Sequence, residues 1–280
     1  MFTYIKVSAL LILISATCAT AQIDQQVSME LSMRFDVPYV GPINKSDTFI
    51  FGPSISHHTE KTEGQRFYAK MLVNDSKGKI IDAKNKLYFK YNIENKEYWK
   101  IPFEKALYKS SSIKTNGASN KKKRSRWSTS FGNSESPIQN VYRTKTSGGL
   151  LLGVESIKWK TTITDSSGGV LIIEEWETPR LPALRLADSL NKSLQHSLGR
   201  PDTMIATFGG GFSNMILESK DINHQLPQIN GEIIKATIQS FEENVSEPAF
   251  AMELEITELI IEPLNKESFN VPKQYTIINQ

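Results

Sequence analysis

Cysteine is almost absent from this chain of 280 residues, and the one present, Cys18, lies in an apolar leader. Lys6 precedes an apolar run over residues 7–14, and Ala19-Thr20-Ala21 places small residues at the spacing that signal peptidase needs, so we expect cleavage before Gln22. The mature chain would then contain no cysteine. That would exclude a disulfide, a thiol nucleophile and a thiolate metal site.

We therefore predict that residues 1–21 are a signal peptide and that residues 22–280 form one exported domain, in the periplasm or at the outer membrane. A lipoprotein signal also ends in a cysteine, but it requires a small residue directly before it, and Thr17 fits this poorly. Soluble export is thus favoured over lipidation at Cys18. The apolar run is too short to span a bilayer, and no later stretch of about 20 apolar residues follows it.

Catalytic signatures are also lacking. Three glycines at 209–211 precede Ser213, but a phosphate loop needs a Lys-Ser or Lys-Thr pair after its last glycine. A hydrolase elbow needs a glycine two residues after the serine, where Met215 stands. We interpret this segment as a turning connection near a helix.

The histidines and carboxylates give no stronger signal. His57 and His58 are adjacent, so on a strand they would face opposite sides, which a zinc site does not favour. Either histidine could pair with a distant serine and carboxylate, but no motif marks the partners. Glu175 and Glu177 would share one face of a strand, as a glycosidase pair would, but solvated edge charges account for them equally well. We predict a protein that is not an enzyme and has neither metal nor cofactor.

Acidic residues are missing from the segment between Lys105 and Ser134, which contains eight basic residues. Without these eight and Lys6 the formal net charge falls from +3 to −6, so the positive charge is local. The serines, asparagines and glycine around it indicate a solvated loop. The alternative is contact with an anionic lipid surface or envelope polymer. The candidate contact residues are Lys121, Lys122, Lys123, Arg124 and Arg126. Nucleic acid is not an expected partner, because one short basic run has a single tryptophan beside it to stack on bases.

Alternation of apolar and polar residues, the period of a sheet with one buried face, dominates the rest of the chain. The strands that it predicts cover residues 29–35, 67–73, 87–93, 157–163, 170–176, 233–241 and 250–256. Turns are expected at 74–78, at 165–169, where they would make a hairpin, and at 95–100, leading into a further strand.

Two further patterns concern the C-terminal strand and a helix. The apolar phase shifts after Ile256, and because a shift of one residue turns every side chain to the other face, we predict a bulge near Thr257 and Glu258. Leucines recur every four residues over 186–198, after Pro182 and before a glycine and a proline. This pattern predicts an amphipathic helix at about 182–199 that packs on the sheet, with docking on a membrane as the alternative.

Three stretches resemble a domain-of-unknown-function family of exported bacterial envelope proteins. Glu262–Tyr275 is similar to its closing motif, which has a Leu-Asn pair, a Phe, a Val-Pro and a final Tyr. Lys79–Ala83 with Lys96–Trp99 resembles its Ile-Ile-Asp strand and Lys-x-Tyr turn, and Glu174–Pro182 resembles its Glu-x-Trp-x-Thr-Pro-x-Leu-Pro segment. The resemblance implies an architecture like that of the LolA and LolB lipoprotein carriers. In those, a curved antiparallel sheet wraps helices and leaves an apolar cavity for acyl chains.

We accordingly expect a mainly β fold with minor α structure, a strongly curved antiparallel sheet or half-barrel with a helix against its concave face. The expected function is non-catalytic binding of a lipid, an acylated protein or another amphiphile in an apolar cavity. The alternative is a structural or adhesion module that contacts an anionic polymer or membrane through the basic loop. Strand aromatics pack in a core more often than they line a cavity. The candidate cavity residues are Phe89, Tyr91, Trp99, Trp159, Trp176, Leu190 and Leu194.

Overall fold

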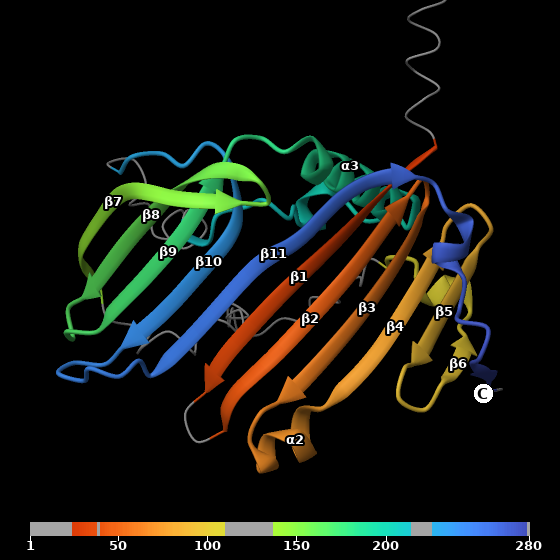
Figure 1. The fold of residues 1–280 in the computed structure, drawn as a ribbon, viewed down its shortest axis with the longest axis horizontal. Coiled ribbons are helices and arrows are strands. Elements are labelled where there is room, and N and C mark those ends of the chain that lie inside the picture. The colour runs from red at the N-terminus through yellow and green to blue at the C-terminus, as the bar shows by residue number, and fades with distance from the viewer. Residues whose placement is uncertain (1–23, 38–39, 110–136, 214–225, 279–280) are drawn as a thin grey trace, which may run out of the picture.

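The computed structural model describes residues 24–37, 40–109, 137–213 and 226–278, which form one open, curved sheet of twelve strands and two α-helices (Figure 1). The strand order is β12-β6-β5-β4-β3-β2-β1-β11-β10-β9-β8-β7. In chain order the strands are β1 (Gln25–Val37), β2 (Gly41–Gly52), β3 (Ile55–Gly64), β4 (Asp75–Asp82), β5 (Leu87–Asn92), β6 (Glu97–Lys100), β7 (Ile138–Leu151), β8 (Val154–Asp165), β9 (Val170–Thr178), β10 (Glu232–Phe241), β11 (Phe250–Pro263) and β12 (Thr276–Ile277). The expected mainly β fold with one long helix is thus confirmed.

Neighbouring strands are antiparallel except at one edge, where β12 pairs in parallel with β6. In each half of the chain, strands that follow one another in sequence also pair side by side, and the two runs join where β1 pairs with β11. The predicted signal peptide, the basic residues 121–126 and the rest of the loop beyond residue 109 lie outside the described residues.

The predicted bulge is present on β11. Glu30 pairs with Glu258 and Leu31 pairs with Ile256, so Thr257 is the extra residue between them. The hairpin of β8 and β9 and the strands at 233–241 and 250–256 are also found as predicted. These segments are long and alternate strictly, so one register alone buries their apolar side chains.

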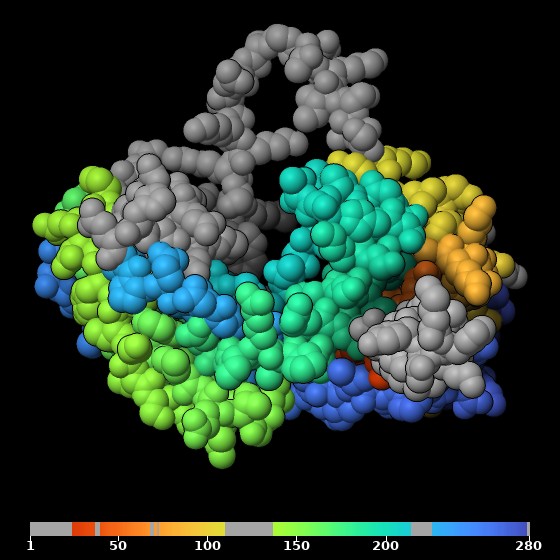
Figure 2. All heavy atoms as spheres, turned by 90° about the horizontal axis from the view of Figure 1, so that it is seen from above, coloured from red at the N-terminus to blue at the C-terminus, as the bar shows by residue number. Residues whose placement is uncertain are grey.

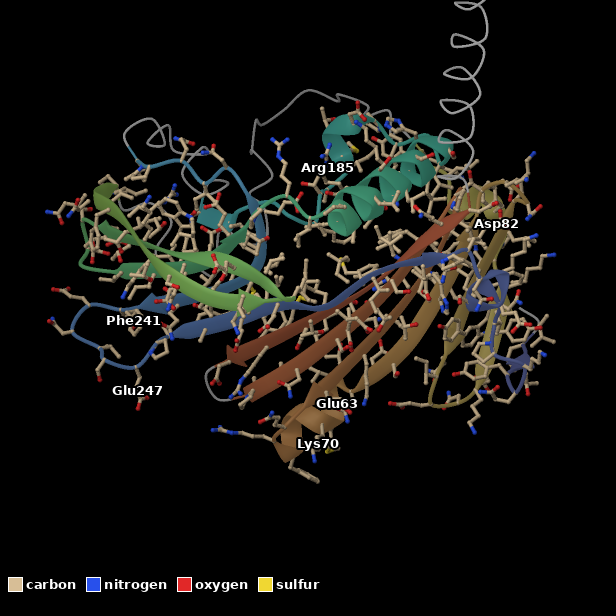
Figure 3. The ribbon with its side chains drawn as sticks, turned by 45° about the horizontal axis from the view of Figure 1, so that its top comes forward. Glu63, Lys70, Asp82, Arg185, Phe241 and Glu247 are labelled. Carbon is tan, nitrogen blue, oxygen red and sulfur yellow. The ribbon has the colours of Figure 1, made fainter. Side chains whose placement is uncertain are left out.

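The strand predicted at 67–73 is wrong. This segment is the helix α2 (Phe67–Val73), and Phe67 and Met71 are 71% and 75% exposed. Seven residues are too few to separate a period of two from a helical period, since Phe67 and Met71 lie four apart and also share a helix face. Figure 3 shows Lys70 of α2 near Glu63 at one end of the strands, with Asp82 at the other end, toward the second helix.

The turn predicted at 74–78 is also wrong, because β4 begins at Asp75 and Gly78 lies in its middle. Gly78 does not form a turn but allows the ring of Tyr91 to lie against the backbone of β4. A Cβ on Gly78 would lie 2.0 Å from Cζ of Tyr91 on the neighbouring strand. Tyr91 therefore packs across the strand where a side chain would otherwise stand.

We predict that Gly78→Ala destabilises the fold by about 1–3 kcal/mol, because the added methyl group overpacks against the ring of Tyr91. Gly210→Ala is the matched control, since its Cβ would meet only Thr207 Oγ1, at 3.7 Å. Urea unfolding of both variants measures the difference. Equal unfolding midpoints would show that the ring of Tyr91 has room to move.

The helix α3 (Pro182–Ser197) confirms the predicted helix and lies on one face of the sheet, here called the concave face (Figure 2). Leu184 and Ala187 are fully buried against β1, β2, β10 and β11. Their partners are Val27, Met29, Phe51, Ile234 and Ile256. Gly199, with φ of +79°, takes the left-handed conformation that ends a helix. No helix in the described part of the chain combines the length and apolar character that a membrane span needs.

The opposite, convex face carries a smaller core under the C-terminal segment. Ile80, Tyr91 and Phe269 are buried together there. His57 fixes the segment, because its Nδ1 donates to the Ser268 carbonyl at 2.6 Å and its Nε2 accepts from the Tyr91 hydroxyl at 2.5 Å. Burial lowers the pKa of His57 below its usual 6.5, and the Ser268 carbonyl only partly opposes this.

A lowered pKa makes the contribution of His57 to stability pH-dependent. The unfolded chain takes up a proton near pH 6.5 that the folded chain takes up only at lower pH, so the stability is full above that pH and is lost as the pH falls. We predict that His57→Gln costs about 1–2 kcal/mol at about pH 8 and flattens the loss between about pH 7 and pH 5. Denaturant unfolding at each pH measures the slope, and a His57→Gln slope equal to that of wild type would contradict the assignment.

Candidate functional site

A groove with a volume of about 700 Å³ lies on the concave face over β3, β4, β5 and β6. The strand register builds it, because His58 pairs with Lys79, Lys79 with Lys90, and Lys90 with Trp99. Paired residues share a face, so these side chains form one row across four strands. The other side chains that line the groove and enter the argument below are Glu60, Asp75, Lys77, Tyr88, Ile101 and Lys105.

The charges in the groove are not balanced. Four lysines face two carboxylates, and both carboxylates are engaged by Lys77, which lies 2.6 Å from Asp75 and 3.7 Å from Glu60. Within the described residues, Lys79, Lys90 and Lys105 make no ion pair with a carboxylate. Lys90 instead lies over the ring of Tyr88, with Nζ 5.6 Å from the centroid.

Lys79 shows the effect of this imbalance. Desolvation by its surroundings lowers the pKa of Lys79, and the positive charges of Arg200 and Lys90 lower it further, against the attraction of Glu60 and Asp47. The groove is therefore a place where positive charge is held without a nearby partner of opposite sign.

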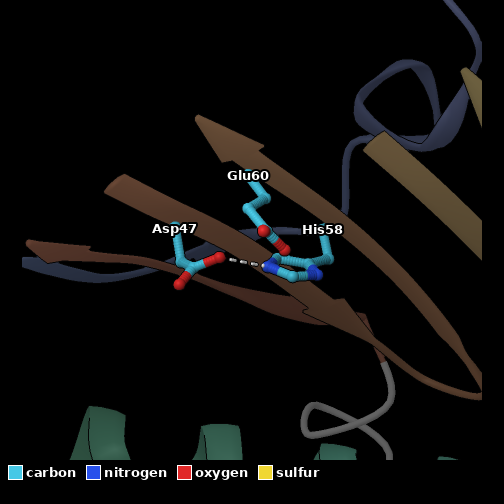
Figure 4. Close-up of side chains that lie close together, drawn as sticks. All are labelled: Asp47, His58 and Glu60. Carbon is cyan, nitrogen blue, oxygen red and sulfur yellow. Dashed lines mark hydrogen bonds and ion pairs between the residues drawn. The ribbon is translucent and has the colours of Figure 1, made fainter. Parts of the chain in front are cut away.

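A second cluster lies beside the groove on β2 and β3 (Figure 4). The Nε2 atom of His58 lies 2.7 Å from Asp47 Oδ1, and the His58 ring stacks on Phe49 with centroids 4.3 Å apart. The third member is Glu60, and one ligand atom from each of Asp47, His58 and Glu60 lies within 4.8 Å of the others. This is a donor set that a divalent metal ion accepts.

The cluster already holds its own counter-charges. Lys45 Nζ lies 2.9 Å from Asp47 Oδ2 and 3.8 Å from Glu60, which Lys77 also approaches. Two lysines thus balance two carboxylates, and a metal ion would have to displace an ammonium group. Burial alone would raise the pKa of Asp47, but the hydrogen bond from His58 and the ammonium of Lys45 outweigh it and lower this pKa. We interpret the cluster as a closed ion-pair network.

Sequence reasoning missed this cluster because it predicted no strand at 41–64. Apolar side chains do not alternate there: the concave side of β2 carries Lys45 and Asp47 before Phe49 and Phe51, and the next strand carries His58 and Glu60. The signal that could have found it is the charge pattern, since opposite charges at alternate positions of two short polar segments suit cross-strand pairs.

A third cluster is fully buried on the other half of the concave face. Ser213 donates its amide to Glu175 Oε1 at 3.1 Å and its hydroxyl to the other carboxylate oxygen, and neither residue is exposed to solvent. Arg143 donates to Ser213 Oγ at 3.0 Å, to Thr161 Oγ1 at 2.9 Å and to the Pro227 carbonyl at 2.7 Å. The network ties the segment after the glycines 209–211 to β7, β8 and β9.

Glu177 anchors the far end of the same segment. Its carboxylate accepts from Trp159 Nε1 at 2.6 Å, from the Asn230 amide at 2.8 Å and from the Gly231 amide. Glu175 and Glu177 do share a face, but they are neither a facing pair across a cleft nor solvated edge charges. Both hold backbone in place, so the reading as edge charges is wrong, and buried hydrogen bonding is the reason.

The seven side chains predicted to line a cavity lie in separate parts of the structure and do not form one lining. Trp99 lies in the groove on the concave face, and Tyr91 reaches its lining from the core of the convex face, where Phe89 also packs. Trp159 is buried in a cluster with Ile229 and Ile233, against which Phe212 packs. Trp176 lies on the convex face between Lys158 and Lys235. The two leucines, Leu190 and Leu194, pack from α3 onto the sheet.

We predict that Glu175→Gln destabilises the protein by about 2–3 kcal/mol, because the glutamine NH₂ group would replace one of the two buried oxygens that accept from the amide and hydroxyl of Ser213. Glu174→Gln is the matched control, since Glu174 faces the other way and forms a partly exposed ion pair with Lys158 at 2.8 Å. Its loss should cost about 1 kcal/mol or less. Denaturant unfolding measures both, and similar losses would refute the buried network as the stronger restraint.

Two of the segments in which the sequence resembles an exported-protein family contribute packed residues to the fold. Within Glu262–Tyr275, Phe269 is buried against the convex face and Tyr275 packs edge-on against Tyr91, with ring centroids 5.6 Å apart. Glu174–Pro182 contains both buried carboxylate anchors and the start of α3. In comparisons with known proteins, no family model and no curated protein matches this chain.

Proposed function

We propose that this protein binds an amphiphile in the groove on the concave face and does so without catalysis. The observation that carries the proposal is the mixed lining of the groove. Tyr88, Trp99 and Ile101 offer apolar and aromatic surface, and Lys79, Lys90 and Lys105 lie among them. A ligand with an apolar part and an anionic part satisfies both kinds of surface, whereas a purely apolar ligand would leave the ammonium groups desolvated.

The size of the groove suits such a ligand. Small-molecule sites commonly measure about 300–1,000 Å³, and this groove, at about 700 Å³, lies within that range. Each methylene group removed from water would contribute about 0.8 kcal/mol before the entropy costs of binding. Affinity would then come chiefly from the apolar part, and the lysines would select the ligand by charge.

A second candidate function is contact with an anionic polymer or membrane surface through the basic residues 121–126. One observation favours it: the last described residues before that segment in the chain, 105–109, begin at the groove. Lys105 lines the groove, and the Tyr108 amide donates to the Leu198 carbonyl at the end of α3 at 2.8 Å. The two candidates make different demands on Trp99, which only the first requires.

Native mass spectrometry with lipid extraction, on protein purified from the cell envelope, tests the first candidate. We expect a co-purifying amphiphile of defined mass and predict that Trp99→Gln reduces its occupancy roughly tenfold through lost apolar contact. Trp176→Gln is the control, because Trp176 lies on the convex face between two lysines.

A clean apo mass that stays unchanged after incubation with phosphatidylglycerol vesicles would reject the amphiphile proposal. Binding of those vesicles that is equal in Trp99→Gln and wild type would instead favour the surface contact.

A further inference from the structure

Lys79 and Lys90 are a pair of like charges in the lining of the groove. They stand directly opposite each other on β4 and β5, where like charges repel. Two other strand lysines, Lys158 and Lys235, lie against carboxylates instead: Lys158 is 2.8 Å from Glu174, and Lys235 is 2.6 Å from Glu255. A cross-strand pair of cations with no carboxylate partner weakens the sheet, so its presence calls for a benefit outside the sheet.

A third cation lines the same groove from another part of the fold. Lys105, on the short 3₁₀ helix Phe103–Lys105, adds a positive charge at the rim. Three lysines, from β4, β5 and this 3₁₀ helix, thus line one groove without an ion pair to a carboxylate among the described residues. Arg200, which follows the last turn of α3, adds to the positive charge that lowers the pKa of Lys79.

We propose that Lys79 and Lys90, with Lys105 at the rim of the groove, form a subsite for a phosphate group, which is the anionic part of the amphiphile. This inference rests on the proposed function of the groove. Phosphate oxygens accept hydrogen bonds from several donors at once, and each ammonium acts as a point charge toward them. A phosphate monoester carries a charge of about −1.5 to −2 at pH 7 and therefore balances more of the positive charge in the groove than a singly charged carboxylate does.

The neighbouring residues set the orientation of the ligand. Trp99 is the cross-strand partner of Lys90, and Tyr88 lies under the ammonium of the same lysine. The apolar part of the ligand would therefore begin beside the phosphate, over Trp99, Tyr88 and Ile101. Glu60 does not compete for the subsite, because Lys45 and Lys77 already lie within 4 Å of its carboxylate.

Isothermal titration calorimetry on the full protein tests the subsite with three probes: dodecyl phosphate, the uncharged dodecyl maltoside and inorganic phosphate. We expect Lys79→Gln and Lys90→Gln each to weaken binding of dodecyl phosphate at least tenfold, because each removes a charge-assisted hydrogen bond. Binding of dodecyl maltoside should change less than twofold. Lys100→Gln is the matched control, since Lys100 is exposed on the adjacent strand β6 but pairs with Phe89 and so faces the convex side.

The probes separate the failure of the subsite from the failure of the groove. If both lysine variants bind dodecyl phosphate as tightly as wild type, the subsite is refuted while the groove proposal stands. If wild type binds inorganic phosphate but neither dodecyl compound, the anion site is supported as a site for free phosphate and the amphiphile proposal fails. Absence of binding by all three probes refutes both.

A stability measurement guards against a variant that simply misfolds. Removing one of two opposed cations relieves repulsion, so Lys79→Gln and Lys90→Gln should raise the melting temperature of the ligand-free protein slightly while they weaken phosphate binding. Dodecyl phosphate should raise the melting temperature of wild type and of Lys100→Gln more than that of either variant. A lower melting temperature in both ligand-free lysine variants would contradict the repulsion on which the subsite is argued.

Discussion

The pairing of β1 with β11 is the constraint on which the rest of the structure depends. These strands come from opposite ends of the described chain, and they pair from Gln25 with Pro263 to Asp36 with Ala251. The Leu264 amide extends the pairing to the Asp24 carbonyl at 2.7 Å. Without the pairing of β1 with β11, the strands β2 to β6 and β7 to β10 would form two separate sheets, each with an additional exposed edge. With it, both runs share one concave face, and α3 can cover the junction.

One row of side chains explains why that face is packed at its centre and open at one end. Across the strands from β11 to β6 the row reads Leu259, Met29, Phe49, His58, Lys79, Lys90 and Trp99. The first three members, Leu259, Met29 and Phe49, lie under α3 and add to the core. The change to charge comes at His58, which stacks on Phe49 and is held by Asp47. A helix that continued over the lysines would have to desolvate them, so the covered region ends where the charges begin.

The sequence predicted well wherever a long segment has one buried face. The hairpin of β8 and β9, the helix α3 and the bulge at Thr257 followed from periodicity, because only one register buries their apolar residues. It failed for the seven residues of α2, where Phe67 and Met71 are exposed, and for Gly78, which makes room for Tyr91 and marks no turn. Local pattern carries no information about such a long-range packing demand.

The candidate site could be predicted only in part, for a related reason. Trp99 was singled out from its strand, but the lysines beside it were not, since each is an ordinary surface residue in its own segment. Their joint role depends on the strand register. If β4 and β5 paired one residue out of step, Lys79 and Lys90 would lie on opposite faces of the sheet, each solvated separately. Residues on separate strands acquire a joint role only after the sheet has aligned them.

The Asp47–His58–Glu60 cluster explains why the groove keeps an excess of positive charge. Its two carboxylates attract Lys79, and in a different arrangement they could neutralise it. Instead Lys45 engages both of them and Lys77 approaches Glu60, and their attraction for Lys79 does not outweigh the desolvation and the repulsion by Arg200 and Lys90 that lower its pKa. The network therefore separates the apolar core from the groove and uses up the negative charge within reach. The proposed anionic ligand would balance the charge of the lysines.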